Sequence, residues 1–316
     1  MEQKQRRGGF GRVIVPLLLF WVIQWIGSAI ISSVISMSLA WPELQKILDK
    51  YANAETLSSA QTDAIWSQIS KIMTDIIPAA TKIILEHSAE LTALLGVLTL
   101  PVMFFFFARD RKLDREEQRP VNKKAPLYKY VFLAGLGVTA CIALNNLENM
   151  CMMAFDLNNS YSGTAEGFYS ASFPIQIICL GLITPLAEEI FYRGVLFQRY
   201  RENGTFMIAA IYSSLLFSIS HSNLVQVIFA LVVGMLMAYA YEKYGSVKAP
   251  IFLHMMVNIT SLVLTRADGF TWMFKNFARL GLVTVGCVFA GSVLFVMIQG
   301  IDEKPENAVS DSELVE

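Results

Sequence analysis

The chain has 316 residues, of which 54% are hydrophobic and only 16% are charged. Soluble domains usually carry about 25% charged residues, so this composition argues against a water-soluble domain and predicts a protein that folds in a bilayer. The net charge of −1 leaves no broad basic surface, so we expect no nucleic-acid partner. The four cysteines lie in or beside apolar runs without a CxxC pair, which argues against a disulfide framework or a zinc knuckle.

Apolar runs of about 20 residues mark membrane-spanning helices, and eight such runs predict an all-α fold, a polytopic membrane helix bundle. The runs cover residues 13–40, 89–108, 127–150, 173–192, 206–220, 224–241, 249–265 and 280–299. The fifth run is short, and the fourth and seventh contain ionisable residues. The first run follows several basic residues, but it is too long for a signal peptide and no clean cleavage site follows it, so we expect a retained anchor.

The distribution of Lys and Arg predicts the orientation of the bundle. With the N-terminus inside, the segments on the cytoplasmic side hold 18 basic residues and those on the opposite side hold seven. Cytoplasmic loops of membrane proteins carry the excess of basic residues. We therefore expect both termini in the cytoplasm.

The same pattern divides the chain into four parts. We expect a basic cytoplasmic N-terminus at 1–12, N-terminal membrane helices at 13–169, a core with the ionisable residues at 170–300, and an acidic, disordered cytoplasmic tail at 301–316. The second part includes an external amphipathic segment at 41–88 and a charged cytoplasmic loop at 109–126. No internal repeat of convincing period is present, so the inverted repeat of many transporters is missing.

The external segment carries apolar residues with helical spacing, and Pro78 is expected to break or kink its helix. The residues that define the spacing are Leu44, Ile47, Leu48 and Tyr51, followed by Ile65, Ile69, Ile72 and Ile76. We predict amphipathic helices on the outer surface.

Ionisable side chains inside membrane spans are costly and mark functional sites. Glu188 and Glu189 are adjacent near the cytoplasmic end of the fourth run. Glu189 and Arg193 are spaced i, i+4 on one helix face, so they can neutralise each other, either within an active site or as a structural ion pair. Glu188 is rotated by about 100° from Glu189 and has no such partner in its own helix. It is therefore the carboxylate that we expect to be free for chemistry.

The i, i+4 spacing recurs in Phe217 with His221 and in His254 with Asn258. The first pair lets an aromatic ring flank an imidazole, and the second presents two polar groups from one helix face. A turn expected at Asn203-Gly204 would place His221 at the depth of Glu188. The short span between the two histidines then requires a tilted helix, a fourth helix that projects into the cytoplasm, or a re-entrant connection near residues 222–223.

The ordered set of these motifs, EExxxR at 188–193, FxxxH at 217–221 and HxxxN at 254–258, resembles the CPBP family of intramembrane proteases. This family includes the type II CAAX prenyl endopeptidases and the bacteriocin-processing and immunity proteins. The resemblance covers residues 170–265, and Tyr192 stands where a phenylalanine often precedes the arginine. It implies an eight-helix protease with a cavity open to the cytoplasm, where Glu188 activates the hydrolytic water and Phe217 contacts substrate.

The resemblance also implies that His221, His254 and Asn258 line this cavity, either with Glu188 as metal ligands or as donors to an oxyanion. The sequence lacks HExxH, the usual signature of soluble zinc proteases. A glutamate and two histidines can hold zinc with room for a water. A desolvated carboxylate can equally act as a general base without a metal, so both routes stay open.

Three classes of function fit these residues. The favoured one is an endopeptidase that cleaves a membrane-associated or lipidated peptide or protein. The others are a non-catalytic immunity or scaffold protein of the same fold, and a proton-coupled transporter that uses the buried acid and histidines as a relay. Membrane lipid and the substrate are the expected partners, and the expected location is a bacterial plasma membrane with the site facing the cytoplasm.

Overall fold

The computed structural model describes residues 10–54, 56–117, 124–154, 167, 169–202, 204–221 and 224–301. Over these ranges the chain consists of helices and short connections without a strand, which confirms the all-α prediction. Seven helices are long and apolar enough to cross a membrane. The protein is therefore an integral membrane protein built as a helical bundle.

The expected fifth span is the exception. It forms α9 (Phe206–Ile219), an apolar helix of only 14 residues. At about 1.5 Å per residue, α9 is roughly 21 Å long, which is shorter than the roughly 30 Å hydrocarbon core of a bilayer. His221, which follows α9 directly, therefore lies at the end of a helix that is too short to span.

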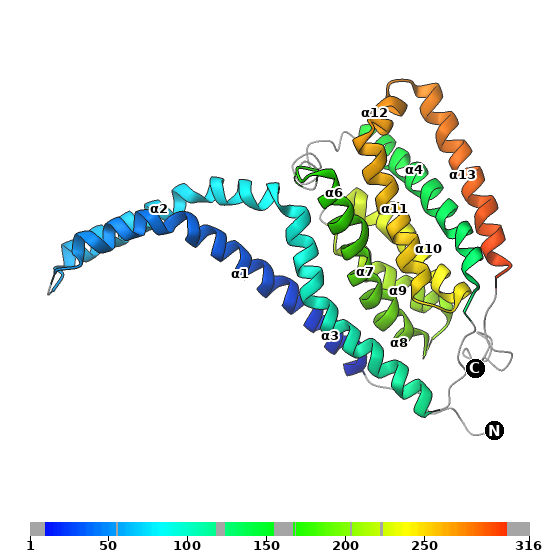
Figure 1. Ribbon diagram of the computed structural model, residues 1–316, viewed down its shortest axis with the longest axis horizontal. Helices are drawn as coiled ribbons and strands as arrows, with labels where there is room; N and C mark the ends of the chain where they lie inside the picture. The colour runs from blue at the N-terminus through cyan, green and yellow to red at the C-terminus, as the bar shows by residue number, and fades with distance from the viewer. Residues whose placement is uncertain are drawn as a thin grey trace.

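Figure 1 shows a bundle on one side of the molecule and a long helical hairpin that extends sideways from it. The hairpin consists of α1 (Phe10–Tyr51) and α2 (Ser59–Glu86), and α3 (Ser88–Glu116) joins it to the bundle. The bundle contains α4 (Tyr130–Ala154), which follows the short helix η1 (Leu127–Lys129), and α9, α10 (Leu224–Tyr244), α11 (Lys248–Arg266), α12 (Gly269–Phe274) and α13 (Phe277–Gln299). It also contains a rod at residues 173–201 that holds the EExxxR motif.

Two apolar clusters hold the helices together. One cluster joins α4 to α10, α11 and α13 through buried residues such as Leu133, Met237 and Leu253. The other surrounds the rod, where Phe191 stacks on Phe20 of α1 with ring centroids 4.1 Å apart. The rod packs against α3, α9 and α11, so the EExxxR motif lies among the helices that carry the other two motifs.

The α1–α2 hairpin confirms the helical spacing seen in the sequence. Ala40, Leu44, Ile47 and Tyr51 of α1 are buried or half-buried, and so are the isoleucines at 65, 69, 72 and 76 of α2. These residues form the seam between two packed helices. Leu48 instead lies outside the seam, and α2 continues through Pro78 without a break. The external position of this segment stays a prediction.

The expected loop at 109–126 is wrong over its first part, because α3 remains helical as far as Glu116. Its charged residues belong to the folded structure, and Asp110 is buried. Other expectations lie partly or wholly outside the residues that the structure describes: most of the basic N-terminus, Asn203 in the predicted turn, the connection at 222–223, and the acidic tail beyond Ile301.

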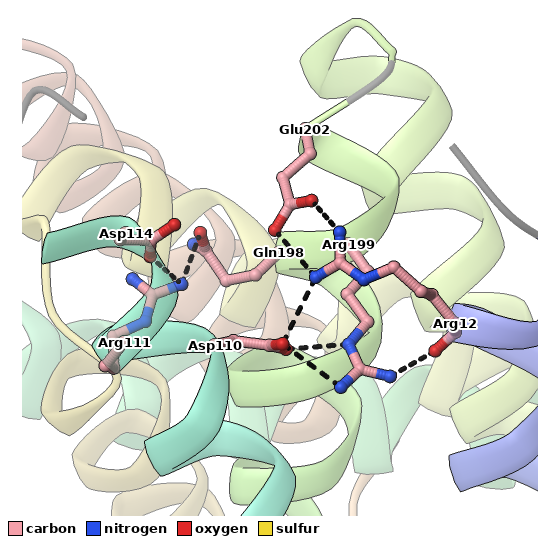
Figure 2. Close-up of polar contacts among 7 residues, drawn as sticks. All are labelled: Arg12, Asp110, Arg111, Asp114, Gln198, Arg199 and Glu202. Carbon is pink, nitrogen blue, oxygen red and sulfur yellow. Dashed lines mark hydrogen bonds and ion pairs between the residues drawn. The ribbon is translucent and has the colours of Figure 1, made fainter. Parts of the chain in front are cut away.

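A network of ion pairs fastens the start of α1 and the end of α3 to the end of the rod (Figure 2). Asp110 of α3 accepts hydrogen bonds from Arg199 Nε at 2.7 Å and from Arg199 Nη2 at 3.2 Å, as a fork. Arg12 Nη2 lies 3.1 Å from Asp110 Oδ1, and Arg12 Nη1 lies 2.6 Å from Glu202 Oε2. Arg199 also donates to the backbone carbonyl of Arg12. The charged residues that we expected in a solvated loop therefore help to hold α1, α3 and the rod together.

We predict that Asp110→Asn lowers the stability of the protein. The substitution removes the charge of a buried carboxylate that pairs with Arg199 and Arg12, and breaking a buried pair by removing one partner costs about 3–5 kcal/mol. Thermal unfolding in detergent measures the change. The control is Glu116→Gln on the same helix, because Glu116 pairs with Lys112 on an exposed surface at 3.7 Å and such pairs contribute about 0–1 kcal/mol. Equal effects of the two substitutions would contradict a structural role for Asp110.

Candidate active site

The EExxxR motif lies within a continuous helical rod that changes its hydrogen-bond pattern twice. After one α-turn, α6 (Phe173–Gln176), residues Ile177–Ile183 (η3) form a π-helix. The α-helix α7 (Thr184–Glu189) follows, then a second π-helix, η4 (Ile190–Phe197), and finally α8 (Gln198–Arg201). π-helical turns are rare and occur mostly at functional sites. Here two of them flank the segment that carries the adjacent glutamates.

The length of the rod changes the expected depth of Glu188. We predicted a span that ends at residue 192, with Glu188 close to its cytoplasmic end. The rod instead continues to Arg201, so Glu188 lies near its middle. His221 directly follows the short α9. A longer fourth helix was one of three alternatives that would bring His221 and Glu188 to similar depth, and the rod has this greater length.

Glu189 and Arg193 form the buried ion pair that their spacing predicted. Arg193 Nη1 donates to Glu189 Oε1 at 2.8 Å, and both side chains are fully buried. The guanidinium also donates from Nη2 to the backbone carbonyl of Gly234 on α10 at 3.1 Å. Its Cζ atom lies 4.7 Å from the centroid of the Phe217 ring, within the range of a cation–π contact. Arg193 thus joins the rod to both α9 and α10.

His254 of α11 lies between the two glutamates. Its Nδ1 atom is 3.0 Å from Glu189 Oε1, and its Nε2 atom is 3.8 Å from Glu188 Oε2. The shorter distance is a hydrogen bond, whereas the longer one exceeds direct hydrogen-bonding distance. Glu189 therefore has a second role that its sequence spacing did not reveal, which is to orient this imidazole.

The partners of the two histidines favour one tautomer in each. The oxygens of an ionised carboxylate and of a carbonyl only accept hydrogen bonds, so Nδ1 of His254 donates to Glu189. His221 Nδ1 lies 3.3 Å from the backbone carbonyl of Phe217 and likewise donates. In the neutral form, Nε2 of each ring is then an acceptor.

Phe217 is the residue that brings the two histidines together. Its ring centroid lies 5.1 Å from that of His221 and 5.7 Å from that of His254, in both cases edge to face. The ring is buried and also contacts Tyr192 at 5.4 Å. Phe217 thus forms a wall of the site, and its contact with substrate stays a prediction.

Asn258 is held one helical turn from His254. Its Nδ2 atom donates to the backbone carbonyl of Leu180 at 2.9 Å, within the first π-helix. This hydrogen bond ties α11 to the rod and leaves the Oδ1 atom of Asn258 for another donor. A role of Asn258 towards an oxyanion or a metal stays a prediction.

The two adjacent glutamates differ in exposure. The Glu188 side chain is 25% exposed, whereas that of Glu189 is 0% exposed. Part of the Glu188 side chain therefore lies at the surface of the bundle, whereas that of Glu189 does not. This difference agrees with the separation of their roles that the helix geometry predicted.

The sequence did not indicate two further residues. Gly234 lies on an apolar helix where a Cβ atom would come 2.8 Å from Ser214 Cβ and 3.0 Å from Arg193 Nη2. Only a glycine lets the α10 backbone approach the guanidinium this closely. Tyr192, which the sequence marked only as a departure from the family pattern, is fully buried four residues after Glu188 and packs edge to face on Phe217. For Gly234, the sequence offered one signal, which is a glycine inside an apolar helical run.

The residues do not form a ready metal site. Across the described ranges, no three His, Cys, Asp or Glu side chains are grouped so that they could hold a metal ion. Nδ1 of His254 is used by Glu189, and the Nδ2 atom of Asn258 by Leu180. These hydrogen bonds do not involve Nε2 of His254 or Oδ1 of Asn258, and zinc at this site stays a prediction.

The fold and these residues together define a polytopic helical membrane protein with a buried cluster of Glu, Arg and His in its bundle. Residues 170–260 match the family model described as "Type II CAAX prenyl endopeptidase Rce1-like". The segment that holds all three motifs is therefore similar to this group of membrane proteases.

One curated relative shares part of the sequence. The chain is 30% identical over 113 residues to a Bacillus subtilis (strain 168) protein named "Putative membrane peptidase YdiL". The match covers 36% of this chain and 46% of the relative, so the chain spans about half the length of the relative that it matches. No solved structure matches the chain.

We predict that Glu189→Gln destabilises the protein by about 3–5 kcal/mol, because it leaves the buried Arg193 without a counter-charge. The double variant Glu189→Gln with Arg193→Met removes both charges and should recover much of the loss. Thermal unfolding of the two single variants and the double variant in detergent measures the coupling. Strictly additive losses would contradict the ion pair.

We also predict that Gly234→Ala is destabilising, although Gly→Ala within a helix usually stabilises by about 1 kcal/mol. The added methyl group would overpack the contact with Ser214 and Arg193, at a cost of about 1–3 kcal/mol. Gly286→Ala in α13 is the matched control, since a Cβ atom there meets nothing within 4 Å. A gain in melting temperature for both variants would contradict the close approach.

Proposed function

We propose that the protein is an intramembrane endopeptidase that hydrolyses a peptide bond of a membrane-associated or lipidated peptide or protein. The observation that carries the proposal is the pairing of a reachable glutamate, Glu188, with an imidazole fixed by a buried carboxylate. The family match and the membrane peptidase relative support the reaction class. They do not depend on the geometry, so the two lines of support are independent.

In the proposed reaction, Glu188 acts as the general base. Its carboxylate takes a proton from a water, whose oxygen attacks the carbonyl carbon of the scissile bond. The tetrahedral intermediate then collapses, the C–N bond breaks, and the proton passes to the leaving amine. Because Nε2 of His254 lies 3.8 Å from Glu188 Oε2, this imidazole is placed to hold the water or to carry the proton.

The buried groups prepare the site for this proton movement. When His254 is protonated, the hydrogen bond from Nδ1 to Glu189 stabilises the imidazolium, as the carboxylate of a catalytic triad does. Arg193 balances the charge of Glu189, which makes the pair close to neutral before the proton arrives. We assign His221 and Asn258 to the oxyanion, with His221 donating from Nε2 in its protonated form and Asn258 donating through the second N–H bond of Nδ2. Phe217 is the wall beside both imidazoles.

We propose the metal-free route of the two that the sequence allows, because the side chains do not converge as ligands. Incubation of the purified protein with a zinc chelator, followed by a cleavage assay, tests this route. We expect activity to persist. Loss of activity that added Zn²⁺ restores would contradict the metal-free route and favour ligation by Glu188 and the two histidines.

The proposed location is a bacterial plasma membrane, with both termini in the cytoplasm and the site open to that side. The excess of Lys and Arg on one side of the predicted layout supports the orientation. Arg12, Asp110 and Arg199 lie in one network at one end of the bundle, as expected for charged residues at a membrane boundary. Labelling of a cysteine at position 60 from the cytoplasmic side alone would contradict this orientation.

The test of the proposed function is Glu188→Gln. The amide keeps the shape of the side chain but cannot take a proton from water, and loss of a general base costs about 10² to 10⁴ in rate. We expect the variant to fold and insert normally while cleavage is abolished. Quantitative comparison of the peptides in cells that express the wild type or the variant identifies the substrate at the same time.

Glu116→Gln, at an exposed position of α3, is the control for the loss of a carboxylate elsewhere in the protein. Its peptides should match those of the wild type. A Glu188→Gln variant that retains near-wild-type cleavage would rule out Glu188 as the base. Peptide profiles that do not differ between wild type and Glu188→Gln would favour a non-catalytic scaffold.

A further inference from the structure

The α1–α2 hairpin has apolar side chains beyond those that are buried in the seam between its two helices. The hairpin leaves large hydrophobic side chains exposed outside the seam, including Leu48 at 58%, Trp66 at 65% and Ile77 at 59%. In Figure 1 this part of the chain extends away from the bundle, across the direction of α3. None of the bundle helices from α4 onwards covers it.

The exposed residues of α2 form one stripe. At 100° per residue, Trp66, Met73 and Ile77 lie within about 40° of one another around the helix. The charged residues Lys71, Asp75 and Lys82 lie about 140–180° away from Trp66. Apart from the seam, α2 therefore has an apolar side and, opposite to it, a charged side.

The end of α1 repeats this arrangement. Its exposed stripe lies within about 60° around the helix and contains Ile30, Val34, Met37, Trp41 and Leu48. Lys46 and Lys50 lie on the opposite side, about 160° from Leu48. This stripe begins within the membrane-spanning part of α1 and continues into the hairpin without interruption.

The two stripes lie on the same face of the hairpin. On each helix the stripe is rotated from the seam by about 80° in the same sense. Because a short connection makes α1 and α2 antiparallel, positions that are offset from the seam in the same sense flank it on the same side. The hairpin is thus an amphipathic slab, with an apolar face that includes Trp41 and Trp66 and a charged face on the other side.

The length of α1 places this slab at a membrane surface. The chain has no charged residue between Arg12 and Glu43, a stretch of 30 residues or about 45 Å of helix. The hydrocarbon core is about 30 Å thick, so with Arg12 at one boundary a tilted α1 reaches the opposite boundary near Trp41. Tryptophan is enriched at this depth.

We infer that the α1–α2 hairpin lies flat in the membrane interface, on the side opposite to the N-terminus of α1, with its apolar face in the lipid. Lipid is the occupant because the stripe continues the lipid-facing side of the span and because most charged residues of the hairpin stand on the opposite face. Asp63 of α2 and Asp49 of α1 are the exceptions, about 60° from Trp66 and about 100° from Leu48. Interfacial helices bind in this way, with aromatic and aliphatic side chains in the acyl boundary and charged ones in water. The hairpin would widen the contact of the protein with one leaflet and fix the tilt of α1 beside the rod.

Spin labels at matched positions test this orientation. Residues two apart lie on opposite faces at nearly the same distance along the hairpin, which gives the pairs Leu48 and Lys50, Trp66 and Gln68, and Ile77 and Asp75. Each is replaced by cysteine and labelled in a chain without its native cysteines, in vesicles of phosphatidylcholine and phosphatidylglycerol. Collision rates with oxygen, which partitions into lipid, and with a water-soluble nickel chelate are then compared.

We expect labels at Leu48, Trp66 and Ile77 to favour oxygen over the chelate by several fold, and labels at their partners to show the reverse. Strong chelate access at both members of each pair would mean that the hairpin stands in water. Labels on the apolar face that are immobile and closed to both reagents would mean contact with a protein, such as a second copy. Either result overturns the inference.

A second measurement avoids replacing the native cysteines. Tryptophan fluorescence of the otherwise unmodified chain is quenched by brominated phosphatidylcholine when the indole contacts acyl chains. Trp66→Tyr should remove emission that this lipid quenches. If the emission lost with Trp66 is insensitive to brominated lipid, the side chain lies outside the bilayer and the inference fails.

Discussion

The buried ion pair between Glu189 and Arg193 is the interaction on which the site depends. Two fully buried charges inside a membrane bundle persist only when they are paired and hydrogen-bonded. Arg193 satisfies this condition with Glu189, the carbonyl of Gly234 and the face of Phe217. Each contact comes from a different helix or segment, so the guanidinium fixes the distances between the rod, α9 and α10.

The same pair prepares the chemistry. Because Arg193 compensates its charge, Glu189 can remain buried and accept a hydrogen bond from His254 Nδ1. The imidazole is then directed towards Glu188, which is the more exposed of the two carboxylates. A structural ion pair and a catalytic arrangement were alternatives for Glu189 in the sequence. In the structure the Glu189 carboxylate both pairs with Arg193 and contacts His254, and a part in catalysis stays a proposal.

Charged residues follow the same physical rule at the end of the bundle. Asp110, Arg199, Arg12 and Glu202 compensate one another where α1, α3 and the rod meet (Figure 2). The N-terminal helices carry no recognisable motif, yet they are joined to the motif-bearing rod by this network and by the stacking of Phe20 on Phe191. The first half of the chain therefore helps to hold the candidate site in place.

The sequence by itself determined the helical membrane fold, the motif order and the pairing of Glu189 with Arg193. Long apolar runs must satisfy their backbone internally in lipid, which leaves the helix as their structure, and residues four apart on a helix must meet. It also predicted the seam of the α1–α2 hairpin, since this spacing is local to each helix. Contacts of this kind need no knowledge of how helices pack.

Only the tertiary structure decided the depth of the site, the partner of His254 and the fate of the charges at 109–116. The rod, which contains two π-helices, continues to Arg201, and α9 is too short for a full span. Counting apolar runs in the sequence reveals neither of these helix lengths. His254 and Glu189 are 65 residues apart in the chain, and Asp110 and Arg199 are 89 apart. Such contacts depend on which helix faces which, and this is set by side-chain packing across the bundle rather than by periodicity along one helix.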